Sequence, residues 1–524
     1  MHIGVDLDNT LINYDDAFFA AADFISVNLP AGVKTKNQIS QFLKLTEEGE
    51  HCWQKLQGLA YGRFLKSHAK LYPGVKRFLL HCHYKGNPVT VVSHKTKQGH
   101  FDSEKIMLRE VVLEFLASKG LMNSQNALIQ KVFFEETHGD KIERIKKSPF
   151  SWFIDDLPKV IRDLKGIDAK LVCFGVDLSD WQQIDNLILG EWSESEVIKL
   201  SSNLMPENLI QAEKNTLGGN GAVYQLFDSG KKSYKLKFYP ADSSRDRLRS
   251  EFESFRLLVE AGIGSVPKPI IQDADLGIGI YEWIEGRLVV DPNEKDLKQS
   301  SEFLASLHAI RDKIEYSAVL KASAACLSGL EIELQIKNRV NCLESVKQEN
   351  GNLELFLEDY FKPISDRLIG LSRQNWSSEI GYEILLPRER QTLSPSDFGF
   401  HNSIKKSDGS LVFIDFEYFG WDDPAKLIAD FVLHPGMQLS SEMVSCWLEE
   451  VTKIYGLDTM RRYATSKPLY GLIWCLILLN DFREDIWTRR VLADPSKQSS
   501  RQTRLEYQLQ KATNLLRNLE EQYL

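Results

Sequence analysis

The feature that most constrains the fold is a regular alternation of short apolar runs with helical stretches over residues 1 to about 200. The apolar runs are HIGVDL, PVTVVS, KVFFEE, SWFIDD and AKLVCFGV, and the segments DKIERIKK and LPKVIRDL between them have helical spacing. Strands that alternate with helices favour a parallel sheet covered on both faces. We therefore predict an α/β domain that ends where the chain turns polar, around residues 200–212.

The pattern changes from about residue 213 onward. A glycine-rich turn and a β-rich segment run to about residue 285, and a mostly helical remainder follows, interrupted by an irregular segment at 394–420. This order predicts a second, α+β domain of two lobes. We place the domain boundary between residues 205 and 206, with the first lobe at about 206–286 and the helical lobe at 287–524.

Composition excludes several classes of function. The 524 residues are 43% hydrophobic and 26% charged, which indicates a multidomain globular protein, and the net charge of −9 indicates neither a nucleic-acid surface nor a membrane anchor. The longest apolar run, YGLIWCLILL, is about half of the roughly 20 residues that span a bilayer. The chain starts with a strand pattern instead of a signal peptide. We expect a cytoplasmic protein with small-molecule partners, without nucleic-acid or membrane partners; the sequence indicates no oligomeric state.

Polar residues gather where the predicted parallel strands end. Asp6 and Asp8 follow the first strand, and because they are two residues apart on extended chain their side chains point to one side. The other strand and helix ends supply Ser93, Lys141, Asp155 and Asp156. One carboxylate can attack an electrophile while its neighbour transfers a proton, and further carboxylates suit Mg²⁺. We predict a phosphate-handling site at this edge of the sheet.

This order of elements, DxDxT followed by Ser, Lys and an acidic pair, resembles the haloacid dehalogenase-like (HAD) phosphatase superfamily over about 200 residues. The resemblance implies a Rossmannoid domain with a small helical C1-type cap at about 12–72. It implies that Asp6 is the nucleophile and that Asp8 is first the general acid and then the base for water.

The same resemblance assigns the remaining residues of this first site. Thr10 and Ser93 would orient the phosphate, and Lys141 would offset its charge. Asp155, Asp6 and the backbone carbonyl of Asp8 would hold Mg²⁺, with Asp156 assisting.

A second set of residues follows the domain boundary. Gly218, Gly219 and Gly221 form a turn between β-like segments, where bare backbone can approach a phosphate, although a plain hairpin turn is the commoner meaning of such a cluster. The strand SYKLKFYP presents Lys235 and Lys237 on one face, and the next helix carries Glu251. A strand lysine paired with a helix glutamate is how kinase folds hold ATP phosphates. The connector from Glu282 to Ile284 would meet the adenine.

The segment SPSDFGFHNSIKKSDGSLVFIDFEYFG carries the remaining chemistry. Asp397 and Asn402 lie five apart, and Asp415 follows an apolar strand. Phosphoryl transfer needs an aspartate to orient the acceptor hydroxyl, and an amide and a carboxylate to hold Mg²⁺.

This segment resembles the aminoglycoside phosphotransferase and choline kinase family over about 300 residues. By that resemblance Asp397 is the catalytic base, and Asn402 and Asp415 are metal ligands. Lys237 contacts phosphate and pairs with Glu251. Lys237 is preferred to Lys235 because the family's strand has an apolar residue before its lysine. The family usually has histidine where this chain has Pro395, which leaves a degenerate, nucleotide-binding kinase open.

These patterns together predict a bifunctional enzyme, a Mg²⁺-dependent phosphatase fused to a kinase that uses ATP or GTP to phosphorylate a small-molecule hydroxyl on a sugar or amino alcohol. A role in surface-polysaccharide or sugar-nucleotide biosynthesis fits such a fusion. Two alternatives stay open: a protein-directed kinase or effector, and a non-catalytic scaffold that senses nucleotide.

Overall fold

The chain forms two compact units in a computed structural model. The model describes residues 1–45, 48–99, 101, 104–122, 127–215, 222–240, 245–347, 350–437, 439–493 and 500–524. The N-terminal unit comprises Met1–Leu200 and Asp275–Gly277, and the C-terminal unit comprises Ser201–Ala274 and Ile278–Leu524. The division between Leu200 and Ser201 lies slightly before the predicted boundary.

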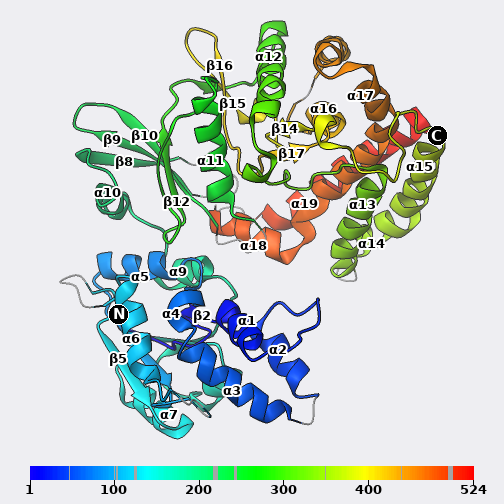
Figure 1. Ribbon diagram of the computed structural model, residues 1–524. Helices are drawn as coiled ribbons and strands as arrows, with labels where there is room; N and C mark the ends of the chain where they lie inside the picture. Colours follow the sequence, from blue (N-terminus) through cyan, green and yellow to red (C-terminus); the bar gives the residue numbers. More distant parts are fainter. Residues whose placement is uncertain are drawn as a thin grey trace. The chain divides into compact units, whose positions relative to one another are not determined.

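A five-stranded parallel sheet is the centre of the N-terminal unit (Figure 1). Its strands are β1 (Ile3–Val5), β4 (Val89–His94), β5 (Lys131–Glu135), β6 (Trp152–Asp155) and β7 (Lys170–Cys173), in the spatial order β5-β4-β1-β6-β7. They fall in the five predicted apolar runs. The order reverses at β1, and in open parallel sheets ligands bind beside the carboxyl ends of the strands at such a point.

Helices cover this sheet, as the alternating pattern predicts. They are α5 (Val75–Tyr84), α6 (Leu108–Ser118), α7 (His138–Lys147), α8 (Pro158–Asp163) and α9 (Trp181–Leu189); helix α10 (Glu194–Ser202) follows and crosses the division at Leu200. Ile3 and Val5 on successive positions of β1 are both fully buried, as expected of a strand covered on both faces.

A helical segment follows β1 and corresponds to the predicted cap. It contains β2 (Ile12–Asn13), α1 (Asp15–Phe24), α2 (Lys36–Leu43), α3 (Gly49–Tyr61), α4 (Leu65–His68) and β3 (Lys70–Leu71), and β2 pairs with β3 in antiparallel fashion. Phe18 of α1 stacks on Trp53 of α3 with ring centroids 5.0 Å apart. A Cβ on Gly99, beyond β4, would lie 2.6 Å from the Cα of Gly58, so glycine at position 99 lets this loop reach α3.

An antiparallel sheet begins the C-terminal unit. Its strands are β8 (Leu209–Asn215), β9 (Val223–Asp228), β10 (Ser233–Phe238), β11 (Pro269–Asp273) and β12 (Ile278–Glu282), in the order β11-β12-β10-β9-β8. Helix α11 (Arg247–Glu260) follows β10, and its N-cap Asp246 accepts a hydrogen bond from the backbone N–H of Arg249. This helix brings its buried face, including Glu251, toward the sheet region.

The remainder is mostly helical. It comprises α12 (Glu294–Ile310), α13 (Gly329–Glu344), α14 (Gly351–Leu355), the π-helix η4 (Phe356–Phe361), α15 (Lys362–Gln374), α16 (Pro424–Leu433), α17 (Ser441–Leu478), α18 (Glu484–Ala493) and α19 (Arg501–Tyr523). Short 3₁₀ helices are η1 (Arg311–Lys313), η2 (Tyr316–Ala318), η5 (Arg388–Arg390), η6 (Phe400–Asn402) and η7 (Leu479–Phe482). Short strands are β13 (Arg287–Leu288), β14 (Thr392–Ser394), β15 (Ser403–Lys405), β16 (Leu411–Phe413) and β17 (Gly420–Asp422).

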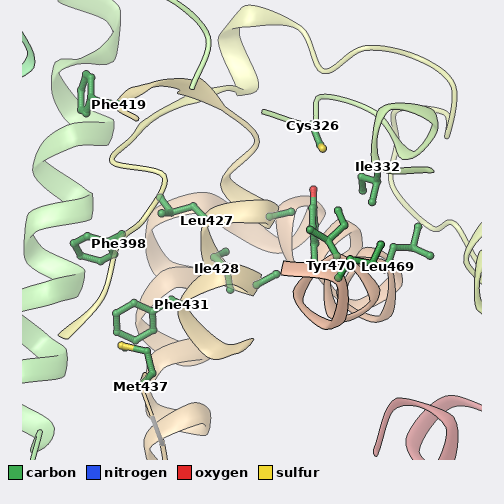
Figure 2. Close-up of a cluster of buried hydrophobic side chains, with 14 of the residues drawn as sticks. Cys326, Ile332, Phe398, Phe419, Leu427, Ile428, Phe431, Met437, Leu469 and Tyr470 are labelled. Atoms are coloured by element: carbon green, nitrogen blue, oxygen red, sulfur yellow. The ribbon is translucent and has the colours of Figure 1, made fainter. Parts of the chain in front are cut away.

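The core of this part lies around α16 and α17. Figure 2 shows Leu427, Ile428 and Phe431 of α16 in one cluster with Tyr470 of α17. The apolar run YGLIWCLILL forms the C-terminal end of α17 and continues into η7. Among the described helices, none combines the length and the apolar character that crossing a membrane requires.

Candidate active sites

A buried lysine links two carboxylates at the carboxyl edge of the parallel sheet. Lys141 of α7 places its Nζ 2.6 Å from Oδ1 of Asp6 and 2.7 Å from Oδ2 of Asp155. Asp6 follows β1 and Asp155 ends β6, so the parallel arrangement of these strands brings the two acids together. All three side chains are buried. The sequence prediction that these residues share one site corresponds to this geometry.

The carboxylates of this first site share an unfavourable surplus of negative charge. Burial raises the pKa of Asp6 to about 7; Lys141 opposes the shift, and repulsion by Asp155 and Asp8 adds to it. Burial, together with the charge of Asp6, likewise raises the pKa of Asp156 to about 6. Asp6, Asp155 and Asp156 each offer a carboxylate oxygen, and these atoms lie within 4.8 Å of one another. Such a set of hard oxygen donors fits Mg²⁺.

Asp8 has a different environment from Asp6. The Nζ of Lys95 lies 2.9 Å from both of its carboxylate oxygens, and the hydroxyl of Tyr14 donates to Oδ1 at 2.5 Å. Burial alone would raise the pKa of Asp8, but the charge and hydrogen bonds of Lys95 and Tyr14 outweigh it and lower this pKa. In this arrangement Asp8 is an ionised acceptor, so the predicted general-acid role first requires it to gain a proton.

A cavity of about 380 Å³ opens beside these residues. Its lining includes Asp6, Asp8, Ser93, Lys95, Lys141 and Asp156, together with Lys36 and Tyr61 from the helical segment. The hydroxyl of Thr10, a predicted phosphate-orienting residue, donates to Oδ2 of Asp6 at 3.4 Å. Thr10 is fully buried, and its hydroxyl also accepts from the backbone N–H of Asp156 at 3.1 Å, which ties the loop after β1 to the loop after β6.

Lys36 and Tyr61 were not predicted as site residues. The Nζ of Lys36 donates to the hydroxyl of Tyr61 at 2.8 Å and to Oδ1 of Asn9 at 3.0 Å. No motif spacing identifies them, because only the packing of α2 and α3 brings them over the end of β1.

The second site is also built around one lysine. Lys237 of β10 donates to Oε2 of Glu251 at 2.6 Å, lies 3.2 Å from Oε2 of Glu417, and bonds to Oδ1 of Asp415. Burial would lower the pKa of Lys237, but the three surrounding carboxylates raise it. Lys235 lies farther from Glu251, at 3.8 Å, which agrees with the choice of Lys237.

The acids around Lys237 form a potential cation site of their own. Glu251, Asp415 and Glu417 each place one carboxylate oxygen within 4.8 Å of the others. Asp415 has a φ of 68°, a backbone conformation that non-glycine residues seldom adopt. Glu417 was not predicted, although its position two residues after Asp415 on the same segment is a usable signal.

Two histidines surround Asp397. The Nε2 of His401 lies 3.0 Å from Oδ1 of Asp397, and the Nε2 of His434 lies 3.8 Å from the same oxygen. The two imidazole rings stack with centroids 3.7 Å apart and planes 7° apart. Burial would raise the pKa of Asp397, but its contacts with His401 and His434 lower it. Burial, reinforced by His401, lowers the pKa of His434 to about 4, so His434 is neutral near pH 7.

The histidine contacts bear on the departure at Pro395. The sequence shows that Pro395 stands where the family usually has histidine. It did not lead us to predict His401 and His434 as residues of this site. His401 directly precedes Asn402, which is a recognisable position, whereas His434 follows α16 and reaches Asp397 only through the fold.

Hydrogen bonds to backbone atoms hold Asn402 near the segment that carries Asp415. The side-chain amide of Asn402 donates to the carbonyl of Asp397 at 2.9 Å, and its own carbonyl accepts from the N–H of Ile414 at 3.0 Å. This pairing brings the loop of Asp397 beside the end of the strand that leads to Asp415.

The predicted nucleotide contacts are only partly described. Gly218, Gly219 and Gly221 lie outside the described residues. Glu282 and Ile284 are half-buried at the end of β12 and in the connector after it. The backbone N–H of Glu282 donates to the carbonyl of Lys268 at 2.8 Å, so this N–H is already used within the fold.

The family comparison bears on the second site. Residues 214–463 match the model described as "Phosphotransferase enzyme family". The C-terminal unit has a kinase-like fold. Its β-rich first lobe carries Lys237 and its helical second lobe carries Asp397, in a mixed α/β architecture of two lobes.

Solved structures are similar at low identity. A spectinomycin phosphotransferase in complex with ADP and spectinomycin is 16% identical, covers 63% of this chain and 99% of its own, and has a TM-score of 0.45. Choline kinase LicA from Streptococcus pneumoniae is 19% identical, covers 62% and 99%, and has a TM-score of 0.40. An ethanolamine kinase from Plasmodium vivax is 16% identical, covers 55% and 82%, and has a TM-score of 0.38. At these scores the likeness bears on neither substrate nor mechanism. No curated protein matches the chain.

Proposed function

We propose that the C-terminal unit is a kinase that transfers the γ-phosphoryl group of ATP or GTP to a hydroxyl of a small molecule. The observation that carries this proposal is the placement of Lys237 against Glu251 and Asp415, in a segment that matches the phosphotransferase model. Phosphoryl transfer depends mainly on positioning and charge stabilisation, and this set of residues is suited to both.

Each residue of the kinase site has a separate task in this proposal. Asp397 accepts the hydrogen bond of the acceptor hydroxyl and then its proton, and His401 orients the carboxylate. Lys237 binds the α- and β-phosphates while Glu251 holds the lysine in place. Asn402 and Asp415 would hold Mg²⁺, which supplies positive charge to the phosphates.

We also propose that the N-terminal unit hydrolyses a phosphate monoester. Asp6 attacks phosphorus, a bond forms between its carboxylate oxygen and phosphorus, and the bond to the ester oxygen breaks while that oxygen takes a proton from Asp8, which must first have gained one. Water then attacks the aspartyl-phosphate, releasing phosphate and restoring Asp6. The ionised Asp8 is suited to accept the proton of this water. Asp6, Asp155 and Asp156 would hold Mg²⁺, which offsets phosphoryl charge.

Paired variants of the full chain test both halves. Asp397→Ala should lower kinase kcat by roughly 10²–10⁴-fold, the usual contribution of a general base, and should leave phosphatase turnover intact. Asp6→Asn should abolish phosphatase turnover and spare the kinase. Replacement of Asp408, which lies in an exposed turn, by alanine is the matched control for the first change.

The measurements are Mg²⁺-dependent ATP consumption and phosphate release, each with mass detection of the product. Loss of both activities in either variant contradicts two separate sites. Labelling of protein from ATP instead of small molecules supports the protein-kinase alternative, and nucleotide binding without any turnover supports the sensing scaffold.

The fusion itself suggests how the two activities relate. Acting on the same position of one metabolite, they would only consume ATP, so we propose different positions of one metabolite or two metabolites of one sequence of reactions, such as sugar-nucleotide or surface-polysaccharide biosynthesis. If neither unit's product is consumed by the other unit, the single-metabolite version is wrong.

A further inference from the structure

A cavity of about 470 Å³ lies next to Asp397 in the C-terminal unit. Its walls include Gln335 and Arg339 of α13, Asp430 of α16, Tyr470 and Trp474 of α17, and Arg490 of α18. Its volume is in the range that small-molecule sites occupy. Under the proposed function, on which this inference rests, the acceptor must present a hydroxyl to Asp397 from this cavity.

The acidic groups of the cavity already have partners. Asp430 receives the ammonium of Lys426 at 2.7 Å on one oxygen and the indole N–H of Trp474 at 3.0 Å on the other. Asp397 is bonded to His401 and is the group that the acceptor hydroxyl needs. An ammonium group on an acceptor would therefore find no carboxylate without a bonded partner among the described lining residues.

Arg339 and Arg490 of the cavity wall, unlike its acidic groups, lack sufficient partners of opposite charge in the part of the chain that the structure describes. Arg339 has no acidic partner among the described residues, and its Nε is buried without a hydrogen-bond acceptor. Arg490 shares a single carboxylate, that of Asp481, with Arg504, whose Nε lies 2.7 Å from Oδ2. One carboxylate thus faces two guanidinium groups. An arginine remains charged in a protein, and a partly buried charge without a counter-ion is costly.

The remaining wall of the cavity suits a polar molecule that contains a ring. The hydroxyl of Tyr470 and Oε1 of Gln335 are buried and have no hydrogen-bond partner among the described residues. The half-buried indole of Trp474 stands beside them on the next turn of α17. Unpaired hydroxyl and amide groups next to an aromatic ring match the hydroxyls and the apolar face of a sugar.

We propose that the acceptor is an anion, a hydroxylated phosphate ester or carboxylic acid of about monosaccharide size, whose anionic group is bound by Arg339 with Arg490 contributing. Its hydroxyl loses a proton to Asp397, a new bond forms between that oxygen and the γ-phosphorus, and the bond to the β-phosphate oxygen breaks. ADP leaves, and the product carries one more phosphate.

The test uses the full chain with Asp6→Asn, so that product is not hydrolysed. Sugar monophosphates, sugar acids, neutral sugars and amino sugars or amino alcohols are offered as acceptors with Mg²⁺ and ATP. We expect kcat/KM for at least one anionic class to exceed that for its neutral parent by about tenfold or more. The phosphate and carboxylate arms identify which anion is used.

Variants locate the effect. Arg339→Gln should raise KM for the anionic acceptor at least about tenfold and leave KM for ATP unchanged, since the guanidinium pairs with the acceptor alone. Arg339→Lys should restore part of the loss. Lys337→Gln, an exposed change two residues away on the same helix, is the control and should alter neither constant. Preferred turnover of amino acceptors, or an Arg339→Gln variant with unchanged KM, overturns the proposal.

Direct binding separates this inference from the proposed function. Calorimetric titration with sugar monophosphate compares the Asp6→Asn chain with and without Arg339→Gln, and phosphate binding in the N-terminal unit is common to both. If no acceptor is phosphorylated but anion binding disappears with Arg339, the kinase proposal fails and the anion site stands. If binding is equal in the two chains, the anion site is wrong, whatever the kinase does.

Discussion

Single lysines neutralise several carboxylates in both units. Lys141 serves Asp6 and Asp155, and Lys237 serves Glu251, Asp415 and Glu417. One positive charge cannot balance two buried carboxylates at the first site, so part of the repulsion remains there. At the second site Arg247 also contacts Glu417 at 3.1 Å, and Lys235 lies 3.8 Å from Glu251. The remaining electrostatic cost is clearest for Asp6, because its pKa is raised from the ordinary 3.8 to about 7.

The raised pKa of Asp6 predicts that replacing this residue stabilises the N-terminal unit, and that the stabilisation depends on pH. Between 3.8 and about 7 the native chain holds a proton that the unfolded chain has released, so the free energy of unfolding falls as pH rises through this window. Asn resembles the protonated aspartate. Asp6→Asn should therefore raise the melting temperature of the N-terminal unit at pH 8 and have little effect at pH 5.

The control for this prediction is Asp168→Asn, which makes the same replacement of a carboxylate by an amide at an exposed position. Thermal unfolding of the three proteins at both pH values is the measurement. A gain for Asp6→Asn that is as large at pH 5 as at pH 8 would contradict the assignment of the pKa.

Candidate site residues next to a predicted strand or helix could be identified from the sequence. Those that only tertiary packing brings to a site could not. Asp6 and Asp155 follow from strand ends that must meet at one edge of a parallel sheet, and Lys141 follows from its place near the start of a helix after another strand. His434 and Lys36 reach their sites from helices whose position no local pattern specifies. The hydroxyl of Thr10 donates to Asp6 and also accepts from the backbone N–H of Asp156, a link between two strand-end loops that the motif alone does not predict.

At the level of elements, strand β17 passes close to another segment of the chain. A Cβ on Gly420 would lie 2.4 Å from the backbone N of Ala322 and from the backbone O of Leu320. Backbone atoms cannot rotate away as the end of a side chain can. The same segment continues to Ser323 and Ala324 on the wall of the cavity beside Asp397. The absence of a side chain at position 420 therefore lets β17 lie against the segment that forms part of this cavity wall.

Gly420→Ala should destabilise the C-terminal unit by about 1–3 kcal/mol, the usual cost of overpacking. Gly370→Ala in α15 is the matched control, since a Cβ there meets nothing within 4 Å. That change should stabilise by about 0.5–1 kcal/mol, because alanine favours a helix over glycine. Urea unfolding of both variants checks the opposite signs, and a stable Gly420→Ala protein would refute the close approach.

The elements themselves were largely predictable from pattern. The apolar runs of the first 200 residues correspond to β1, β4, β5, β6 and β7, and the mostly helical remainder predicted after residue 285 contains the helices from α12 to α19. Short strands such as β14 and β17 were not separated from the irregular segment at 394–420. They have three residues each and are held by pairing with distant chain, which leaves no periodicity to detect.

The whole molecule contains separate hydrophobic cores. One includes Ile3, Phe18 and Trp181, and another includes Phe303 and Phe431; among the described residues they share no member. Each unit therefore has its own main source of stability.

Calorimetry of the full chain should accordingly show two unfolding transitions. ADP at about 100 times its Kd should stabilise one transition by about 2.7 kcal/mol, because it binds only the folded kinase-like unit. Gly420→Ala should lower that same transition, and Asp6→Asn should move only the other. A single transition that shifts as a whole with ADP would contradict independent units.

The lysines at the two sites also bear on how the protein matures. Because each cluster of acids already holds an ammonium group from its own chain, neither unit depends on a divalent ion to bring its acids together during folding. Under the proposed functions, newly made protein would then fold without magnesium, and magnesium would be required only for turnover.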